Sequence, residues 1–294
     1  MKYELGLSSC GKELNDKLFC AYKENGITKM ELSKLSKSDY SQMDFREVEI
    51  LAKKYGVQLW SLHLPFAPLT EIDISSTDED LRISTIKKFK DLIEKGAQIG
   101  IKYFIVHPSG EPIEDVNREN KMRQAKKSLT QLAEIAADYN AVIVVENLPR
   151  TCLGNCSKEI LELVSVDTRL RVCFDTNHLL GEKIEEFILA VGEKIITTHV
   201  SDYDAVNERH WLPGEGVIDW NNLIDALEKI GYKGPWLYEI DFGIPKTILR
   251  DRLLTCEDFA RNAKHPEKSQ IPGENFPKKT FCPGWSTKIR RKSF

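Results

Sequence analysis

The sequence has no long apolar run, no regular cysteine pattern and no glycine-rich phosphate loop. No apolar stretch approaches the ~20 residues of a membrane-spanning helix, and the amino-terminal residues lack an apolar leader pattern. We therefore expect a cytoplasmic protein without membrane contact. The seven cysteines among 294 residues stand at irregular spacings, which predicts reduced thiols instead of a disulfide framework. Without a phosphate loop after the first predicted strand, a nucleotide-binding open sheet is disfavoured.

Charge is distributed unevenly along the chain. The net charge is −3, yet residues 264–294 carry eight basic and two acidic side chains, whereas residues 1–263 carry 34 basic and 43 acidic ones. An acidic body disfavours an extended contact with a phosphate backbone, so nucleic acid is not an expected partner. We predict a single domain over residues 1–263, followed by a basic, irregular extension over residues 264–294.

Apolar, β-rich runs alternate with segments of helical periodicity throughout the predicted domain. The last helical segment is expected to run from Pro245 to about Ala263. Eight alternations of strand and helix predict an α/β fold, a (β/α)8 TIM barrel with a closed parallel sheet. The expected strands cover residues 3–8, 27–32, 57–64, 103–107, 141–147, 170–175, 195–200 and 236–240.

Six of these strands end in residue types that bind divalent metals. In a TIM barrel the carboxyl ends of the strands meet at one rim, where the active site is built. Imidazoles and carboxylates together suit Mn, Zn, Co or Mg. Glu146 is the strongest candidate, because an unpaired charge at the end of the apolar run VIVVE would be costly to bury. The six residues are His63, His107, Glu146, Asp175, His199 and Glu239.

The loop after His199 is the most polar part of the predicted rim. It offers Glu208, Arg209 and His210, and it closes with the turn Pro-Gly-Glu-Gly. The two glycines of this turn fit either a tight loop or a close approach of the backbone to a ligand. Four aromatic side chains are candidates to line a sugar pocket, because apolar sugar faces pack on aromatic rings: Trp60, Phe66, Trp211 and Trp236. Trp60 shares the expected strand of His63, and its alternative interpretation is a core residue.

Several of these segments together resemble one known family. The motifs, in chain order, are SLHLPF, FIVHPSG, VVEN, FDTNH, HVSD, ERHWLPGEGVIDW and YEI. They are similar to those of the xylose isomerase-like TIM-barrel superfamily, over roughly residues 1–263. This group includes sugar-phosphate isomerases and epimerases, ketose 3-epimerases, relatives of inosose isomerase and endonuclease IV. The resemblance implies a barrel enzyme, and it leaves the substrate open.

The ketose 3-epimerase branch binds one divalent metal ion through Glu, Asp, His and Glu. The resemblance places these ligands at Glu146, Asp175, His199 and Glu239, and it implies that both glutamates act as the catalytic acid and base. It thereby implies a small sugar-like substrate, isomerised or epimerised through a metal-stabilised enediolate. Candidate substrate-binding residues are His63, His107, His178, Arg209, His210 and Trp60.

The endonuclease IV branch binds three zinc ions through nine ligands, and eight of these match in residue type. The ninth, an aspartate in a D-x-H motif, is Glu208 here. This resemblance implies the alternative of a multi-zinc phosphodiester hydrolase. A lyase or dehydratase acting on a keto-sugar is a further alternative. We favour one metal ion per chain and leave homo-oligomerisation open. Candidate additional ligands are His63, His107, His178, Glu208 and His210.

Overall fold

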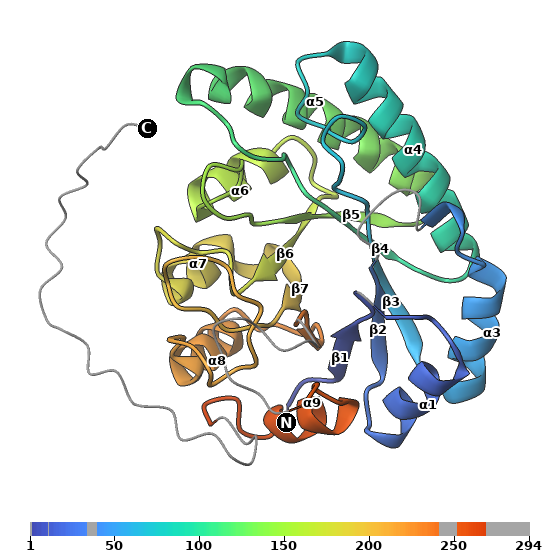
Figure 1. Cartoon of the computed structure of the whole chain (residues 1–294). Helices are drawn as coiled ribbons and strands as arrows, with labels where there is room; N and C mark the ends of the chain where they lie inside the picture. The colour runs from blue at the N-terminus through green and yellow to red at the C-terminus, as the bar shows by residue number, and fades with distance from the viewer. Residues whose placement is uncertain (1, 11, 34–39, 241–251, 269–294) are drawn as a thin grey trace, which may run out of the picture.

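Eight parallel strands alternate with helices in the computed structural model, which describes residues 2–10, 12–33, 40–240 and 252–268 (Figure 1). The strands are β1 (Leu5–Ser8), β2 (Lys29–Leu32), β3 (Gln58–His63), β4 (Tyr103–Val106), β5 (Val142–Glu146), β6 (Arg171–Asp175), β7 (Ile195–His199) and β8 (Trp236–Tyr238). The helices are α1 (Asp16–Glu24), α3 (Phe45–Tyr55), α4 (Glu79–Gln98), α5 (Asp115–Asp138), α6 (Ser157–Val164), α7 (Ile184–Val191), α8 (Trp220–Lys229), α9 (Cys256–Asn262) and the 3-10 helix η1 (Gly192–Lys194).

The sheet closes into a barrel because each strand pairs with its sequence neighbours. The strand order is β7-β6-β5-β4-β3-β2-β1-β8. The remaining seam, between β7 and β8, is joined by hydrogen bonds from Val200 N to Leu237 O (2.8 Å) and from Glu239 N to Val200 O (3.2 Å). The predicted (β/α)8 TIM barrel is therefore confirmed.

Local signals explain where the helices begin and end. Asp44, Asp78 and Asp219 each accept backbone N–H groups in the first turn of α3, α4 and α8, respectively. Gly56 ends α3 in the left-handed conformation, at φ 67°. The helices surround the barrel (Figure 1). Their buried apolar residues pack with those of the strands in the main hydrophobic core.

The prediction of one continuous helix from Pro245 to Ala263 is wrong. Residues 245–251 lie outside the described part of the chain, and residues 252–255 are not helical. Helix α9 begins only at Cys256, because Thr255 and Asp258 form a capping box that fixes its start. Arg252 donates to both oxygens of Asp258 (2.6 and 2.7 Å), which holds the preceding chain against this cap.

The barrel interior changes in character along its axis. Its middle is apolar, formed by Ile105, Val144 and Cys173, with Tyr103 and Ile196 packed against them. The carboxyl ends of the strands carry buried acids and histidines instead. The apolar plug therefore closes the barrel below the rim, so the charged side chains face the loops.

Three further predictions concern the cysteines, membrane-spanning helices and the end of the chain. The six described cysteines are free thiols, as expected for that part. Within the described ranges, we find no helix with the length and apolar composition needed to cross a bilayer. The predicted basic extension falls almost entirely outside the described residues, which reach only residue 268.

Candidate active site

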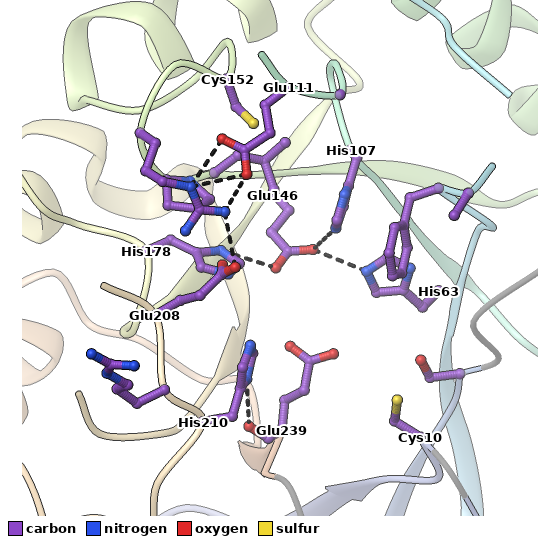
Figure 2. A pocket seen from close by; sticks show the side chains of 18 of the residues that line it. Cys10, His63, His107, Glu111, Glu146, Cys152, His178, Glu208, His210 and Glu239 are labelled. Atoms are coloured by element: carbon purple, nitrogen blue, oxygen red, sulfur yellow. Dashed lines mark hydrogen bonds and ion pairs between the residues drawn. The ribbon is translucent and has the colours of Figure 1, made fainter. Parts of the chain in front are cut away.

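A pocket of about 840 Å³ lies at the carboxyl ends of the strands (Figure 2). Side chains from several strand ends and from the loop after β7 point into it. An apolar wall that includes Phe66, Leu148 and Ile240 faces these polar groups. The sequence-predicted residues that line the pocket are His63, His107, Glu146, His178, Glu208, Arg209, His210 and Glu239.

Four residues, here called the quartet, converge at the base of this pocket: Glu146, Asp175, His199 and Glu239. Each offers one ligand atom, and these four atoms lie within 4.8 Å of one another. His199 Nδ1 lies 3.1 Å from Glu146 Oε1, 3.0 Å from Glu239 Oε2 and 3.8 Å from Asp175 Oδ2. Three carboxylates therefore surround one imidazole nitrogen in a largely buried site.

The quartet has the chemistry of a metal site. Asp175 is fully buried, and its Oδ2 atom has no hydrogen-bond partner among the described residues. Burial raises the pKa of Asp175 to about 7, because a carboxylate loses its hydration there. A divalent cation would give this oxygen a partner and offset the clustered negative charge. One imidazole and three carboxylates form a donor set that suits Mn, Zn, Co or Mg.

Glu31, a residue that our sequence reasoning missed, orients the quartet's histidine. His199 Nε2 lies 3.0 Å from Glu31 Oε2, which also accepts a hydrogen bond from Ser61 Oγ (2.8 Å). Because Nε2–H donates to Glu31, the Nδ1 atom of His199 is the nitrogen that faces the three carboxylates of the quartet. Glu31 is fully buried on β2. Its available signal was the polar alternation of Lys29 and Glu31 inside the apolar run ITKMEL.

A second group, His63, His107 and Glu146, shares a carboxylate with the quartet. Both imidazole Nε2 atoms approach Glu146 Oε2, at 3.1 Å for His63 and 3.3 Å for His107. His63 Nδ1 lies 2.8 Å from Leu64 O, and Phe66 stacks on His107 with ring centroids 4.6 Å apart. Burial disfavours the His63 cation, but the carboxylate of Glu146 outweighs this and raises the pKa of His63 to about 9.

A third group, His178, Glu208 and His210, here called the outer cluster, lies nearer the loops. Its ligand atoms are also within 4.8 Å of one another. His178 Nδ1 lies 2.9 Å from Asn147 O, and its Nε2 lies 3.3 Å from Glu208 Oε2. The other oxygen of Glu208 accepts a hydrogen bond from Arg150 Nη2 at 2.9 Å. The imidazole of His178, together with Arg150, lowers the pKa of Glu208 to about 2.

The loop that carries the outer cluster is organised by Asp202. Its carboxylate accepts hydrogen bonds from Gly214 N (2.9 Å), Ile218 N (3.2 Å) and Trp220 Nε1 (3.0 Å). A Cβ atom on Gly216 would lie 2.2 Å from Asp202 Oδ1. Of the two interpretations of the Pro-Gly-Glu-Gly turn, the structure therefore supports the tight loop, which folds around a buried carboxylate.

Arg209 and His210 are positioned by their backbone as well as by their side chains. Asn177 Oδ1 accepts hydrogen bonds from Arg209 N (2.8 Å) and His210 N (3.3 Å). The guanidinium of Arg209 donates from Nε to Asp204 Oδ2 at 2.8 Å. Asn177, another residue that sequence reasoning missed, thus joins the loop after β6 to the loop after β7.

Trp60 does not line the pocket that the described residues form. Trp60 lies toward the amino end of the barrel, where its Nε1 donates to Thr197 Oγ1 (3.1 Å) and its ring packs 4.7 Å from Tyr103. A register shift between β2 and β3 falls at this position, which allows Trp60 and Ser61 both to point inward. Of the two interpretations of Trp60, the structure therefore supports a residue packed inside the barrel.

The remaining aromatic candidates divide between pocket and core. Phe66 lines the pocket formed by the described residues, whereas Trp211 and Trp236 do not. Trp236 is buried and packs edge-on against Trp220, with ring centroids 5.7 Å apart. Trp211 is also buried, and it lies beside the guanidinium of Arg209 at 5.9 Å.

Comparisons with known proteins agree with this architecture. An inosose isomerase from Bacillus velezensis is 26% identical over 84% of this chain and 93% of its own length. A probable endonuclease 4 from Thermoplasma acidophilum is 25% identical over 65% of this chain and 70% of its own. The solved structure of an L-ribulose 3-epimerase superposes with a TM-score of 0.74 at 19% identity, covering 90% of this chain and 92% of that one.

The family assignment rests on a match over most of the chain. The family model described as xylose isomerase-like TIM barrel matches residues 19–255. This range contains every strand-end residue discussed above and most of the barrel. The chain therefore belongs to the xylose isomerase-like TIM-barrel family.

Proposed function

We propose that this protein is a metal-dependent isomerase or epimerase acting on a small sugar, cyclitol or keto-sugar. The observation that carries the proposal is the placement of two glutamates beside the same imidazole nitrogen. Glu146 Oε1 and Glu239 Oε2 lie 3.1 and 3.0 Å from His199 Nδ1, and both side chains point into the pocket (Figure 2). A pair of carboxylates at a polarising site is what proton removal and return beside a carbonyl require.

The quartet residues would hold the metal ion, which when bound polarises a carbonyl and its neighbouring hydroxyl and so acidifies the C–H bond between them. One glutamate then removes that proton, and the other delivers a proton to the opposite face or to the neighbouring carbon. Burial opposes ionisation of Glu146, but the imidazoles of His199 and His107 hold the pKa of its carboxyl well below the usual range. Glu146 is thus ionised, which is the form that a base needs before it accepts a proton.

Residues around the quartet would bind and orient the substrate. His63 and His107 lie on one side of Glu146, while His178 and His210 lie on the loop side. Their imidazole nitrogens suit the hydroxyl groups of a polyol, which donate and accept hydrogen bonds. Arg209 lines the same pocket and is a further candidate to contact a substrate oxygen. The inosose isomerase relative supports a polyhydroxylated substrate.

Solvent-deuterium exchange tests this function directly. The metal-loaded protein is incubated in D2O with a panel of ketoses and inososes, and mass spectrometry follows the substrates and products. We expect a deuterium label on carbon in at least one substrate and its isomer, with no label from the metal-free protein. Loss of water from the substrate would indicate the lyase alternative, and no labelling across the panel would contradict the proposal.

A phosphodiester hydrolase is the second candidate, because two further groups of potential ligands adjoin the quartet. The endonuclease 4 relative also supports it. This function requires ions in all three groups to activate water against a phosphate. Cleavage of a DNA duplex with one abasic site, with a steep dependence on salt, would favour it over the isomerase.

A further inference from the structure

Arg150 links three loops at the wall of the pocket. Its Nε atom donates to both oxygens of Glu111 (2.9 Å each), and its Nη1 donates to Asn207 Oδ1 (2.5 Å). Its Nη2 donates to Glu208 Oε1 at 2.9 Å. Arg150 therefore ties the loops after β4 and β5 to the loop that carries the outer cluster.

The backbone holds this guanidinium in place. Arg150 is one of few non-glycine residues with a left-handed backbone, at φ 51°. Asn155 Nδ2 donates to Arg150 O at 2.7 Å, which secures that conformation from within the same loop. A left-handed backbone conformation costs free energy at an arginine unless neighbouring groups support it. Because Asn155 supports it here, the side chain of Arg150 is directed toward Glu111 and Glu208.

The guanidinium lies where it competes with a metal ion for Glu208. An arginine stays charged in proteins, so it cannot leave this carboxylate by losing a proton. One Glu208 oxygen is taken by Arg150, and the other faces His178 Nε2 at 3.3 Å. A cation bound between His178, Glu208 and His210 would therefore lie close to a fixed positive charge, which repels it.

The quartet differs in this respect. Its Asp175 Oδ2 has no hydrogen-bond partner among the described residues, and the Asp175 carboxylate contacts two imidazoles and the backbone amide of Asn177. An extra methylene distinguishes Glu208 from the aspartate of the D-x-H motif. In this chain the longer side chain reaches Arg150. The longer side chain of Glu208 and the guanidinium of Arg150 thus form one ion pair beside the outer cluster.

We propose that Arg150 sets the number of metal ions in this chain, because its guanidinium holds Glu208 and keeps the outer cluster free of metal. The proposal rests on the proposed function, in which the quartet alone binds an ion. It assigns Arg150 a positioning role that restricts the site to one-metal chemistry. A ketose-type substrate is then bound by the imidazoles that a multi-metal enzyme would use as ligands.

The number of ions per chain tests this role. The full-length protein is stripped with a chelator, reloaded with excess Zn²⁺, passed through a desalting column and measured by elemental analysis. We expect one ion per chain for the wild type and one additional ion for Arg150→Met. Arg150→Asn should give the same gain, and it also protects the test against misfolding because asparagine tolerates a left-handed backbone.

Matched variants locate any additional ion. Adding Glu208→Gln to Arg150→Asn should remove the gain, whereas Glu111→Gln alone, which leaves the guanidinium beside Glu208, should not produce it. The proposal is overturned if both Arg150 variants, folded by circular dichroism, bind as many ions as the wild type. It is also overturned if Glu208→Gln lowers the wild-type value.

The proposed function can fail separately from this role. If the Arg150 variants gain an ion but the wild type labels no sugar in D2O, the isomerase proposal fails and the role of Arg150 stands. If the wild type labels a sugar and the variants gain no ion, the isomerase proposal stands and the role of Arg150 fails.

Discussion

The quartet and the outer cluster lie in one pocket and are built from the same residue types, yet their charges are balanced differently. In the quartet, three carboxylates surround His199, and Asp175 keeps an oxygen without a hydrogen-bond partner in the described chain. In the outer cluster, the single carboxylate of Glu208 is paired with Arg150 and faces His178. Residue type alone therefore does not decide where a metal binds, because a protein cation can take the same place.

The strongest test of the quartet removes its carboxylate charges. Glu146→Gln and Glu239→Gln should each lower deuterium exchange by at least about 10²–10⁴-fold, because an amide cannot accept the substrate proton. The rate is measured on metal-loaded protein, with exposed Glu193→Gln as the matched control. Normal exchange in either quartet variant would remove the assignment of that glutamate as acid or base.

Histidine replacements compare the two regions directly. His199→Ala should abolish retention of the metal ion through desalting, since it removes the only imidazole of the quartet. His210→Ala should leave the metal content unchanged and raise KM, because it removes a substrate contact. Elemental analysis and steady-state kinetics on the same samples give both values. Equal metal loss in the two variants would erase the proposed difference between the regions.

A smaller effect is expected from the residue behind the quartet. Glu31→Gln should weaken metal binding by about 10–100-fold, because His199 Nε2–H loses a charged acceptor at 3.0 Å. Competition with a fluorescent chelator measures this affinity. Ser61→Ala, which removes only the hydroxyl that donates to Glu31, should have a weaker effect. Unchanged affinity in Glu31→Gln would show that His199 is oriented without it.

The smallest effect on the quartet should come from a change in the loop that carries the outer cluster. Gly216→Ala places a methyl group against Asp202 and should destabilise the protein by about 1–3 kcal/mol, measured by urea unfolding. The quartet stands on strands and its metal content should not change. Loss of the ion from folded Gly216→Ala would mean that the loop also supports the quartet.

The fold and the strand-end candidates could be predicted from the sequence because both follow from local patterns, whereas the family resemblance singled out the four residues of the quartet among them. Strand–helix alternation specifies the barrel, and the last residue of a strand must lie at the rim, as Glu146 and Asp175 do. Helix caps such as Asp44, Asp78 and Asp219 were likewise visible as short-range signals.

The remaining features depend on contacts between distant segments. Glu31 lies 168 residues before His199, and Arg150 contacts Glu208 from 58 residues away, so no local pattern joins them. The register shift beside Trp60 depends likewise on the pairing of β2 with β3, which no local pattern indicates. The start of α9 was misjudged because Pro245 is a common helix signal, whereas the capping box at Thr255 decides the boundary.

Elemental analysis of the untagged wild-type protein shows directly how many metal ions the pocket holds. We predict one divalent ion per chain, held by Glu146, Asp175, His199 and Glu239. A value near three, with zinc dominant, would contradict the single-metal site and favour the hydrolase. A value near zero after addition of Mn, Zn, Co or Mg would mean that the quartet is not a metal site.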